Sequence, residues 1–174
     1  MRLSAIPAMV TMIPSVLCGV GLRDLEKIKA IVRRAYPDVR QLNSETLAEW
    51  MQTSAEVLVV DVRSREELAV SHLKDAVNLR SVGEIMEAVR GRKVSETVLY
   101  CSVGFRSSRL AEILAEQGLA DVMNLEGSIF QWANENRPIY RGELPVEEVH
   151  PYGKRWAGLL KAGLVKECGH LASV

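Results

Sequence analysis

The chain has 174 residues, 48% of them hydrophobic, and it carries 22 lysine and arginine residues against 22 aspartate and glutamate residues. This length fits one domain of ordinary size with extensions. The net charge is zero, so the chain has no excess of basic residues of the kind typical of nucleic-acid-binding proteins. Three widely spaced cysteines, Cys18, Cys101 and Cys168, exclude a disulfide framework.

The N-terminal segment is strongly apolar. Residues 3–22 carry no charge, and about twenty such residues can span a bilayer as a helix. A single arginine, Arg2, before an apolar run is also typical of a signal peptide, although no Ala-x-Ala cleavage site follows. A disordered leader is the third interpretation of residues 1–21. We expect a cytoplasmic protein, with a membrane-tethered or exported protein as the alternative; a membrane is a partner only if residues 3–22 are an anchor.

From Leu22 onward the sequence alternates between predicted helices and strands. Helical spacing of apolar residues predicts an amphipathic helix from Leu22 that ends before Pro37. Ser64 with Glu67 and Ser81 with Glu84 form capping boxes that begin two later helices. The predicted strands are Val39–Leu42, Val57–Val62, Ala76–Leu79, Val98–Cys101 and Val122–Leu125. This alternation predicts an α/β fold with about five parallel strands and helices on both faces.

We expect a reactive site in the stretch Thr97–Leu110. A strand that ends at Cys101 meets a helix through a tight loop, and such loops point backbone N–H groups into one concavity at the positive end of a helix dipole. An unperturbed thiol is about 3% ionised at neutral pH, and lowering its pKa by ~2 units makes most of it thiolate. Gly104 lets the loop bend, and Arg106 can bond loop carbonyls or a bound anion. The pattern predicts a nucleophilic cysteine that meets anions; a buried structural cysteine is the alternative.

Two further polar residues follow the neighbouring predicted strand. Ligands bind at the carboxyl ends of parallel strands, so Asp61 and Arg63 are expected at the same rim as Cys101. Asp61 is expected to orient the loop or Arg106, or else to cap the next helix from the surface. Arg63 is expected to pair with an acidic neighbour as part of the scaffold.

After Trp132 the chain is polar and interrupted by prolines, which predicts a surface strap. Apolar residues from Trp156 to Val165 then predict an amphipathic helix, and we expect it to dock on the core rather than on a membrane. Cys168 and His170 could form half a metal site, but no second pair of ligands accompanies them, so we predict no metal. The expected divisions are the leader 1–21, a domain with its preceding helix over 22–142, and the strap and helix over 143–174.

Four motifs in this chain resemble those of the rhodanese-like sulfurtransferases, in the family's order. The loop Cys101–Ser107 resembles the family's Cys-x-x-Gly-x-Arg-Ser active site, and Val57–Arg63 is similar to its strand that ends in Asp-Val-Arg. Ser71–Leu79 resembles the family's Gly-His-Ile-x-Gly-Ala-x-Asn-Ile, and Asn124–Trp132 resembles its Leu-x-Gly-Gly-x-x-x-Trp. The resemblance covers residues 39–140.

The resemblance implies a three-layer rhodanese-like fold, and the helices predicted before and after it are N- and C-terminal extensions. It also implies a sulfurtransferase in which the Cys101 thiolate takes the sulfane sulfur of a small donor such as thiosulfate. The persulfide on Cys101 then passes its terminal sulfur to cyanide or a thiol, and a sulfur-accepting protein is a further candidate acceptor. The implied active-site loop comprises Ser102, Val103, Gly104, Phe105, Arg106 and Ser107. No cofactor beyond the covalent persulfide and no nucleic-acid partner are expected.

Two alternatives of other classes stay open. Several positions depart from the family pattern: Ser71, Asp75 and Ser128 stand where glycine is usual, and Ser102 stands where many members carry arginine or lysine. These departures and the long extensions leave room for a non-enzymatic binding or sulfur-carrier module. Cysteine-dependent phosphatases and arsenate reductases also use a loop between cysteine and arginine, but theirs has five intervening residues where this chain has four.

Overall fold

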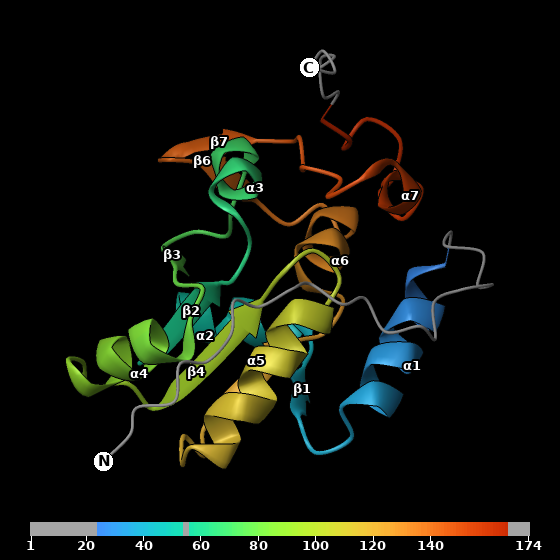
Figure 1. Ribbon diagram of the computed structural model, residues 1–174. Helices are drawn as coiled ribbons and strands as arrows, with labels where there is room; N and C mark the ends of the chain where they lie inside the picture. The colour runs from blue at the N-terminus through green and yellow to red at the C-terminus, as the bar shows by residue number, and fades with distance from the viewer. Residues whose placement is uncertain (1–23, 54–55, 167–174) are drawn as a thin grey trace, which may run out of the picture.

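The computed structural model describes residues 24–53 and 56–166. A five-stranded parallel sheet of order β1-β5-β4-β2-β3 forms its centre (Figure 1). The strands are β1 (Arg40–Leu42), β2 (Val57–Asp61), β3 (Val77–Asn78), β4 (Glu96–Tyr100) and β5 (Val122–Leu125). The predicted α/β class and all five predicted strands are confirmed, with ends that differ by at most two residues.

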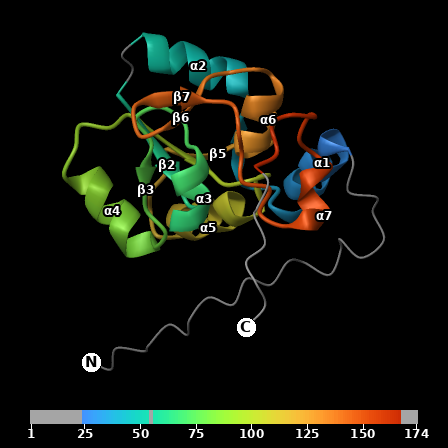
Figure 2. The ribbon, with the colours of Figure 1, turned by 90° about the horizontal axis from the view of Figure 1, so that it is seen from above.

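Helices cover both faces of this sheet, so the molecule has three layers (Figure 2). The helices are α1 (Leu25–Ala35), α2 (Ser44–Gln52), α3 (Arg65–Val70), α4 (Val82–Arg90), α5 (Phe105–Glu116), α6 (Ser128–Asn134) and α7 (Lys154–Ala157). Helices α4 and α5 pack on one face, and α2 and α6 pack on the other. The two predicted capping boxes are present at α3 and α4, where each serine accepts from the N3 backbone and each glutamate side chain accepts from the cap backbone.

The central strands are apolar on both sides because each side contacts a layer of helices. Leu58 and Leu99 pack in the cluster with α4 and α5, while Val59 and Val98 pack in the cluster with α2 and α6. Successive residues of a strand point to opposite faces, so a strand covered on both faces reads as a continuous apolar run. This packing fixes the carboxyl ends of β2 and β4 side by side, with Asp61 paired to Tyr100.

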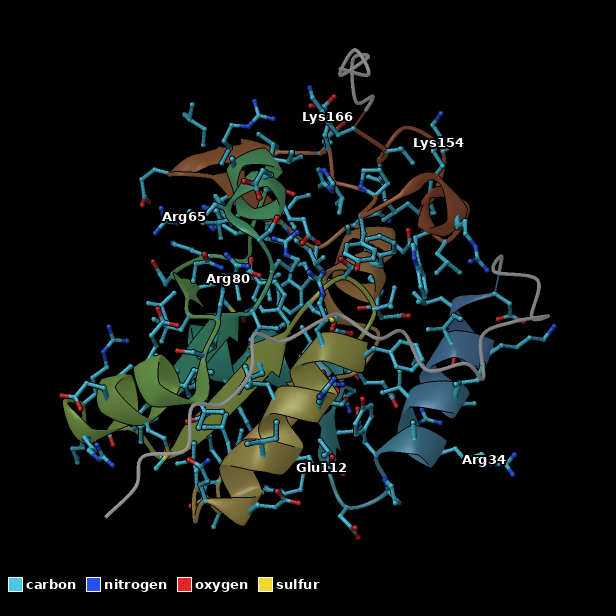
Figure 3. The ribbon with its side chains drawn as sticks, in the orientation of Figure 1. Arg34, Arg65, Arg80, Glu112, Lys154 and Lys166 are labelled. Atoms are coloured by element: carbon cyan, nitrogen blue, oxygen red, sulfur yellow. The ribbon has the colours of Figure 1, made fainter. Side chains whose placement is uncertain are left out.

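Our prediction of a C-terminal helix over Trp156–Val165 is wrong in the length of the helix. Helix α7 has four residues, and the chain continues in tight turns in which the Leu160 and Leu164 N–H groups donate to carbonyls three residues earlier. Gly158 follows the helix directly, and Gly163 adopts a φ of 91° that continues no right-handed helix. The predicted docking is confirmed, since Trp156, Leu159 and Leu160 are buried in the cluster that contains α1 residues Ile28 and Val32. Charged residues such as Arg34 on α1 and Lys154 on α7 remain on the outside (Figure 3).

The segment that we predicted as a surface strap contains an antiparallel hairpin. Strand β6 (Ile139–Arg141) pairs with β7 (Leu144–Val146), and Gly142 provides the positive φ of 58° at the turn. Pro145 misled the prediction, because proline is excluded from the interior of a sheet but tolerated in an edge strand. His72 joins this hairpin to the domain, because its backbone N–H and C=O bond the C=O and N–H of Tyr140, each at 2.8 Å.

Three of the sequence predictions lie outside the described residues: the leader 1–21, Cys18, and the pair Cys168 and His170. Within residues 24–53 and 56–166, no helix combines the length and the apolar character needed to cross a bilayer. No group of three or more metal-ligating side chains occurs within that part of the chain.

Candidate active site

Cys101 lies directly after β4, at the carboxyl edge of the sheet, and only 1% of its surface is exposed. Two groups of its own loop approach the sulfur: the Gly104 N–H donates to Sγ at 3.1 Å, and Ser107 Oγ lies 3.4 Å from Sγ. Gly104 occupies the N-cap of α5 with a φ of 108°, a region that favours glycine. The loop therefore turns back on the sulfur and places it at the positive end of a helix dipole.

The first turn of α6 fixes the loop from behind. The N–H groups of Ile129 and Phe130 donate to the carbonyls of Cys101 and Ser102, each at 3.2 Å. Ser128 Oγ accepts from the Cys101 N–H at 3.1 Å and donates to the Leu125 carbonyl at 3.1 Å. The serine that departs from the family's second glycine thus holds the backbone of Cys101. Sequence reasoning recorded Ser128 only as a departure and missed this role.

Arg106 is held by Glu67 rather than left free for an anion. Its two terminal nitrogens donate to the two carboxylate oxygens of Glu67, each at 2.7 Å, and Ser102 Oγ bonds both partners at 2.9 Å. Burial would raise the pKa of Glu67, but the guanidinium lowers this pKa to about 2. Ser102 is itself buried, so it ties Glu67 to Arg106 inside the loop. The sequence indicated Glu67 as the end of a capping box and did not predict its pairing with Arg106.

The expected roles of Asp61 and Arg63 are only partly found. Asp61 is fully buried, and its side chain forms no hydrogen bond or ion pair with the loop or Arg106 among the described residues, so the expectation that it orients them is wrong, as is the surface-cap alternative. Its carboxylate instead accepts from the Arg63 guanidinium at 2.7 Å and from the Tyr100 hydroxyl at 2.8 Å. Arg63 also donates to the Ser71 carbonyl, so the pair braces β2 against the segment after α3. The parallel register pairs Asp61 of β2 with Tyr100 of β4, so the Asp61 side chain meets Tyr100 rather than the loop.

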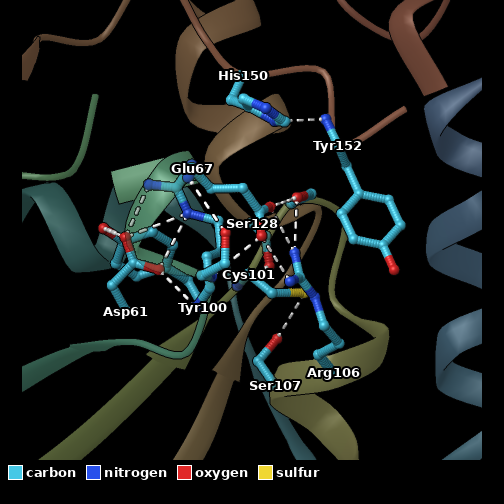
Figure 4. Close-up of polar contacts among 12 residues, drawn as sticks. Asp61, Glu67, Tyr100, Cys101, Arg106, Ser107, Ser128, His150 and Tyr152 are labelled. Atoms are coloured by element: carbon cyan, nitrogen blue, oxygen red, sulfur yellow. Dashed lines mark hydrogen bonds and ion pairs between the residues drawn. The ribbon is translucent and has the colours of Figure 1, made fainter. Parts of the chain in front are cut away.

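Residues of the C-terminal strap lie over the loop (Figure 4). The Arg106 guanidinium lies 4.6 Å from the centroid of the Tyr152 ring, a cation–π contact. Tyr152 has a φ of 62°, unusual for a bulky residue, and its N–H donates to His150 Nδ1 at 3.0 Å. The sequence indicated only a turn here, because nothing in a local pattern predicts a contact across 46 residues of chain.

The surroundings of Cys101 favour its thiolate. Burial alone would raise the pKa of the thiol, but the Arg106 charge, with the backbone N–H groups of Ser107 and Gly104, lowers this pKa below its ordinary value. Of the other loop residues, Val103 and Ser107 are buried and Phe105 is half-buried, so they complete the wall of the loop. The geometry is that of an enclosed sulfur whose ionised form is stabilised by its surroundings.

Comparison with known proteins identifies a family over nearly the same residues that the four sequence motifs cover. The family described as Rhodanese-like domain matches residues 43–135. The sulfurtransferase of Allochromatium vinosum is 32% identical over 105 residues, which cover 60% of this chain and 98% of that protein. The tRNA uridine(34) hydroxylase of Acaryochloris marina is 26% identical, covering 66% of this chain and 42% of that protein. The crystal structure of thiosulfate sulfurtransferase from Pseudomonas aeruginosa shares the fold, with a TM-score of 0.57 at 15% identity over 71% of this chain and 24% of that chain.

Proposed function

This chain belongs to the rhodanese-like domain family, and on that premise we propose that it is a sulfurtransferase whose sulfur carrier is Cys101. The observation that carries the proposal is the enclosed sulfur, with the Gly104 N–H directed at it from 3.1 Å and the positive charge of Arg106 beside it. The similarity to a protein named sulfurtransferase supports the same reaction class.

The proposed donor is thiosulfate or a similar small molecule with a sulfane sulfur. The Cys101 thiolate attacks this sulfur, the sulfur–sulfur bond of the donor breaks, and sulfite leaves with the electron pair. The negative charge then rests on the terminal sulfur of the persulfide, where loop N–H groups stabilise it. Charge and atoms balance without a metal or an organic cofactor, so the proposed cycle needs only the covalent persulfide.

The proposed acceptor is cyanide in an assay and a thiol in the cell, either a small thiol or that of a sulfur-accepting protein. The acceptor attacks the terminal sulfur of the persulfide, and the thiolate of Cys101 leaves with the electrons of the broken bond. Thiocyanate or a new persulfide is released, and the enzyme returns to its starting state.

The position of Arg106 speaks against phosphatase or arsenate-reductase activity. An arginine that recognises an oxyanion presents its two-nitrogen fork to that anion, but here both terminal nitrogens donate to Glu67. A single terminal sulfur on Cys101 makes no such demand. A pure binding module would require no activated thiol, so the surroundings of Cys101 favour the enzyme over that alternative as well.

The test is a thiosulfate:cyanide transfer assay on single cysteine variants. Cys101→Ser is expected to abolish transfer, because a serine hydroxyl stays protonated near neutral pH, while near-ultraviolet circular dichroism stays unchanged. Cys18→Ser and Cys168→Ser are the matched controls, and both are expected to keep the wild-type rate. Transfer that persists in the Cys101 variant would overturn the proposal.

A further inference from the structure

A chain of polar side chains runs from Cys101 across three elements of the domain. Ser107 on α5 lies 3.4 Å from the Cys101 sulfur and donates to Asn124 Oδ1 at 2.6 Å. Asn124 on β5 donates from Nδ2 to Gln41 Oε1 at 2.7 Å, and the parallel register places Gln41 of β1 beside it. Ser107 and Asn124 are fully buried, and Gln41 is half-buried at the edge of the sheet. The proposed sulfur transfer uses neither Asn124 nor Gln41.

The direction of each hydrogen bond in this chain is fixed from the Gln41 end. Gln41 Nε2 donates to the Val39 carbonyl at 3.3 Å, so its Oε1 is the atom that faces Asn124. The Asn124 amide consequently turns its Nδ2 to Gln41 and its Oδ1 to Ser107. Amide orientation is an assignment from the network, and here Gln41 Oε1 decides it, because an amide oxygen can only accept and therefore requires Nδ2 of Asn124.

Ser107 has one hydroxyl hydrogen to give. Asn124 Oδ1 is 2.6 Å away and the Cys101 sulfur is 3.4 Å away, so the hydrogen goes to Asn124. The serine oxygen then faces the sulfur with a lone pair. A lone pair suits a thiol, which has a hydrogen to donate, but it opposes a thiolate, which needs to accept one.

We propose that Asn124 is a positioning residue for Cys101. By accepting the Ser107 hydrogen, it prevents the hydroxyl from donating to the Cys101 sulfur and so disfavours ionisation of the thiol in the resting protein. The Gly104 N–H and Arg106 favour the thiolate, so Asn124 acts as an opposing control on the same sulfur. The inference rests on the proposed function only in taking Cys101 as the nucleophile.

The charged and titratable groups around the sulfur lie on elements other than β5, so they remain in place when Asn124 is changed. Arg106 of α5, paired with Glu67 of α3, acts directly on the thiol. Tyr36, which follows α1, lies close enough for its pKa to respond to the Cys101 charge. The Asp61–Arg63 pair is neutral as a whole and is fully buried beneath Tyr100. A change in the ionisation of Cys101 on substitution of Asn124 would therefore come from the redirected hydroxyl.

The first test compares thiolate titration in wild-type protein and Asn124→Leu, both in a Cys18→Ser/Cys168→Ser background, by the ultraviolet absorbance of the thiolate. Leucine has a similar shape but no acceptor, so the Ser107 hydroxyl is free to turn to the sulfur. The midpoint is expected to fall by about one pH unit, a tenfold change in the ionisation constant, as befits one hydrogen bond to a charged group.

A double-mutant cycle separates this mechanism from a general disturbance of the site. In a Ser107→Ala background, Asn124→Leu is expected to leave the midpoint unchanged, because no hydroxyl remains to redirect. If the midpoint shifts equally in both backgrounds, or fails to fall in the single variant, the proposal is wrong.

Gln41→Leu provides a second route if Asn124→Leu fails to fold. It removes the acceptor that fixes the Asn124 amide, which can then turn its Nδ2 to Ser107 and release the hydroxyl toward the sulfur. The midpoint is expected to fall again, and an unchanged or raised midpoint would overturn the proposal. These titrations require no sulfur transfer, so failure of the proposed function, seen as transfer that persists in Cys101→Ser, and failure of the present proposal are distinguishable.

Discussion

Replacing Glu67 by glutamine is the sharpest test of how the loop is held. The substitution keeps the size of the side chain and one oxygen, but leaves the Arg106 guanidinium without its charge partner. The pKa of Glu67 falls from an ordinary 4.5 to about 2 in the folded protein. At about 1.4 kcal/mol per pH unit, this difference corresponds to about 3 kcal/mol of stability. Loss of one partner of a buried ion pair costs a similar amount, about 3–5 kcal/mol.

The pH dependence of this loss follows from the direction of the shift. A carboxyl whose folded pKa is lowered contributes its full stability above the unfolded value near 4.5 and loses it as the pH falls toward 2. Urea unfolding of wild type and Glu67→Gln should therefore differ by about 3 kcal/mol at pH 7, and the gap should narrow steadily below pH 4.5.

Glu66→Gln is the matched control for this experiment, because Glu66 is the neighbouring residue on α3, is exposed, and forms no ion pair among the described residues. Its urea midpoint at pH 7 should stay close to that of wild type. A gap for Glu67→Gln that stays constant from pH 7 to pH 3, or that is below ~1 kcal/mol at pH 7, would refute the view that this pair braces the loop.

Three further predictions concern the loop and the strap. Gly104→Ala should destabilise the protein by roughly 1–3 kcal/mol and strongly reduce transfer, because the residue has a φ of 108° and its added Cβ would lie 3.2 Å from Asn124 Nδ2. Gly118→Ala is the control, since Gly118 has a φ of 92° but no neighbour within 4 Å of an added Cβ. It should destabilise the protein without reducing kcat. Tyr152→Leu should lower the urea midpoint through loss of a contact worth about 0.5–1 kcal/mol, whereas Tyr152→Phe, which keeps the ring over Arg106, should not. Wild-type protein should not hydrolyse p-nitrophenyl phosphate, and one glycine inserted after Gly104 should remove most sulfur transfer; phosphatase turnover comparable to sulfur transfer would contradict the assignment.

Local patterns were sufficient to predict the sheet and the position of Cys101 at the end of β4. Strand β2 is a short apolar run because it is buried on both faces, and the capping boxes of α3 and α4 consist of residues three apart. Cys101 follows from the same local information, since the end of a strand and the start of a helix are both recognisable in sequence. Such features depend on neighbours in the chain, which a sequence displays directly.

The long-range contacts of the site could not be predicted in this way. Glu67 reaches Arg106 across 39 residues of sequence, and Tyr152 reaches the same guanidinium from the strap. The rim position of Asp61 predicted a role at the loop or as a surface cap, but the register of β2 and β4 places its carboxylate against Tyr100 and Arg63. The length of α7 was overestimated because apolar spacing outweighed Gly158 and Gly163.

The most direct test of the central claim is the mass of the peptide that contains Cys101, measured after incubation with thiosulfate and again after addition of cyanide. The account predicts one added sulfur on Cys101 after the first step. It further predicts loss of that sulfur, with formation of an equal amount of thiocyanate, after the second. Formation of thiocyanate while the Cys101 peptide never gains a sulfur would contradict the account.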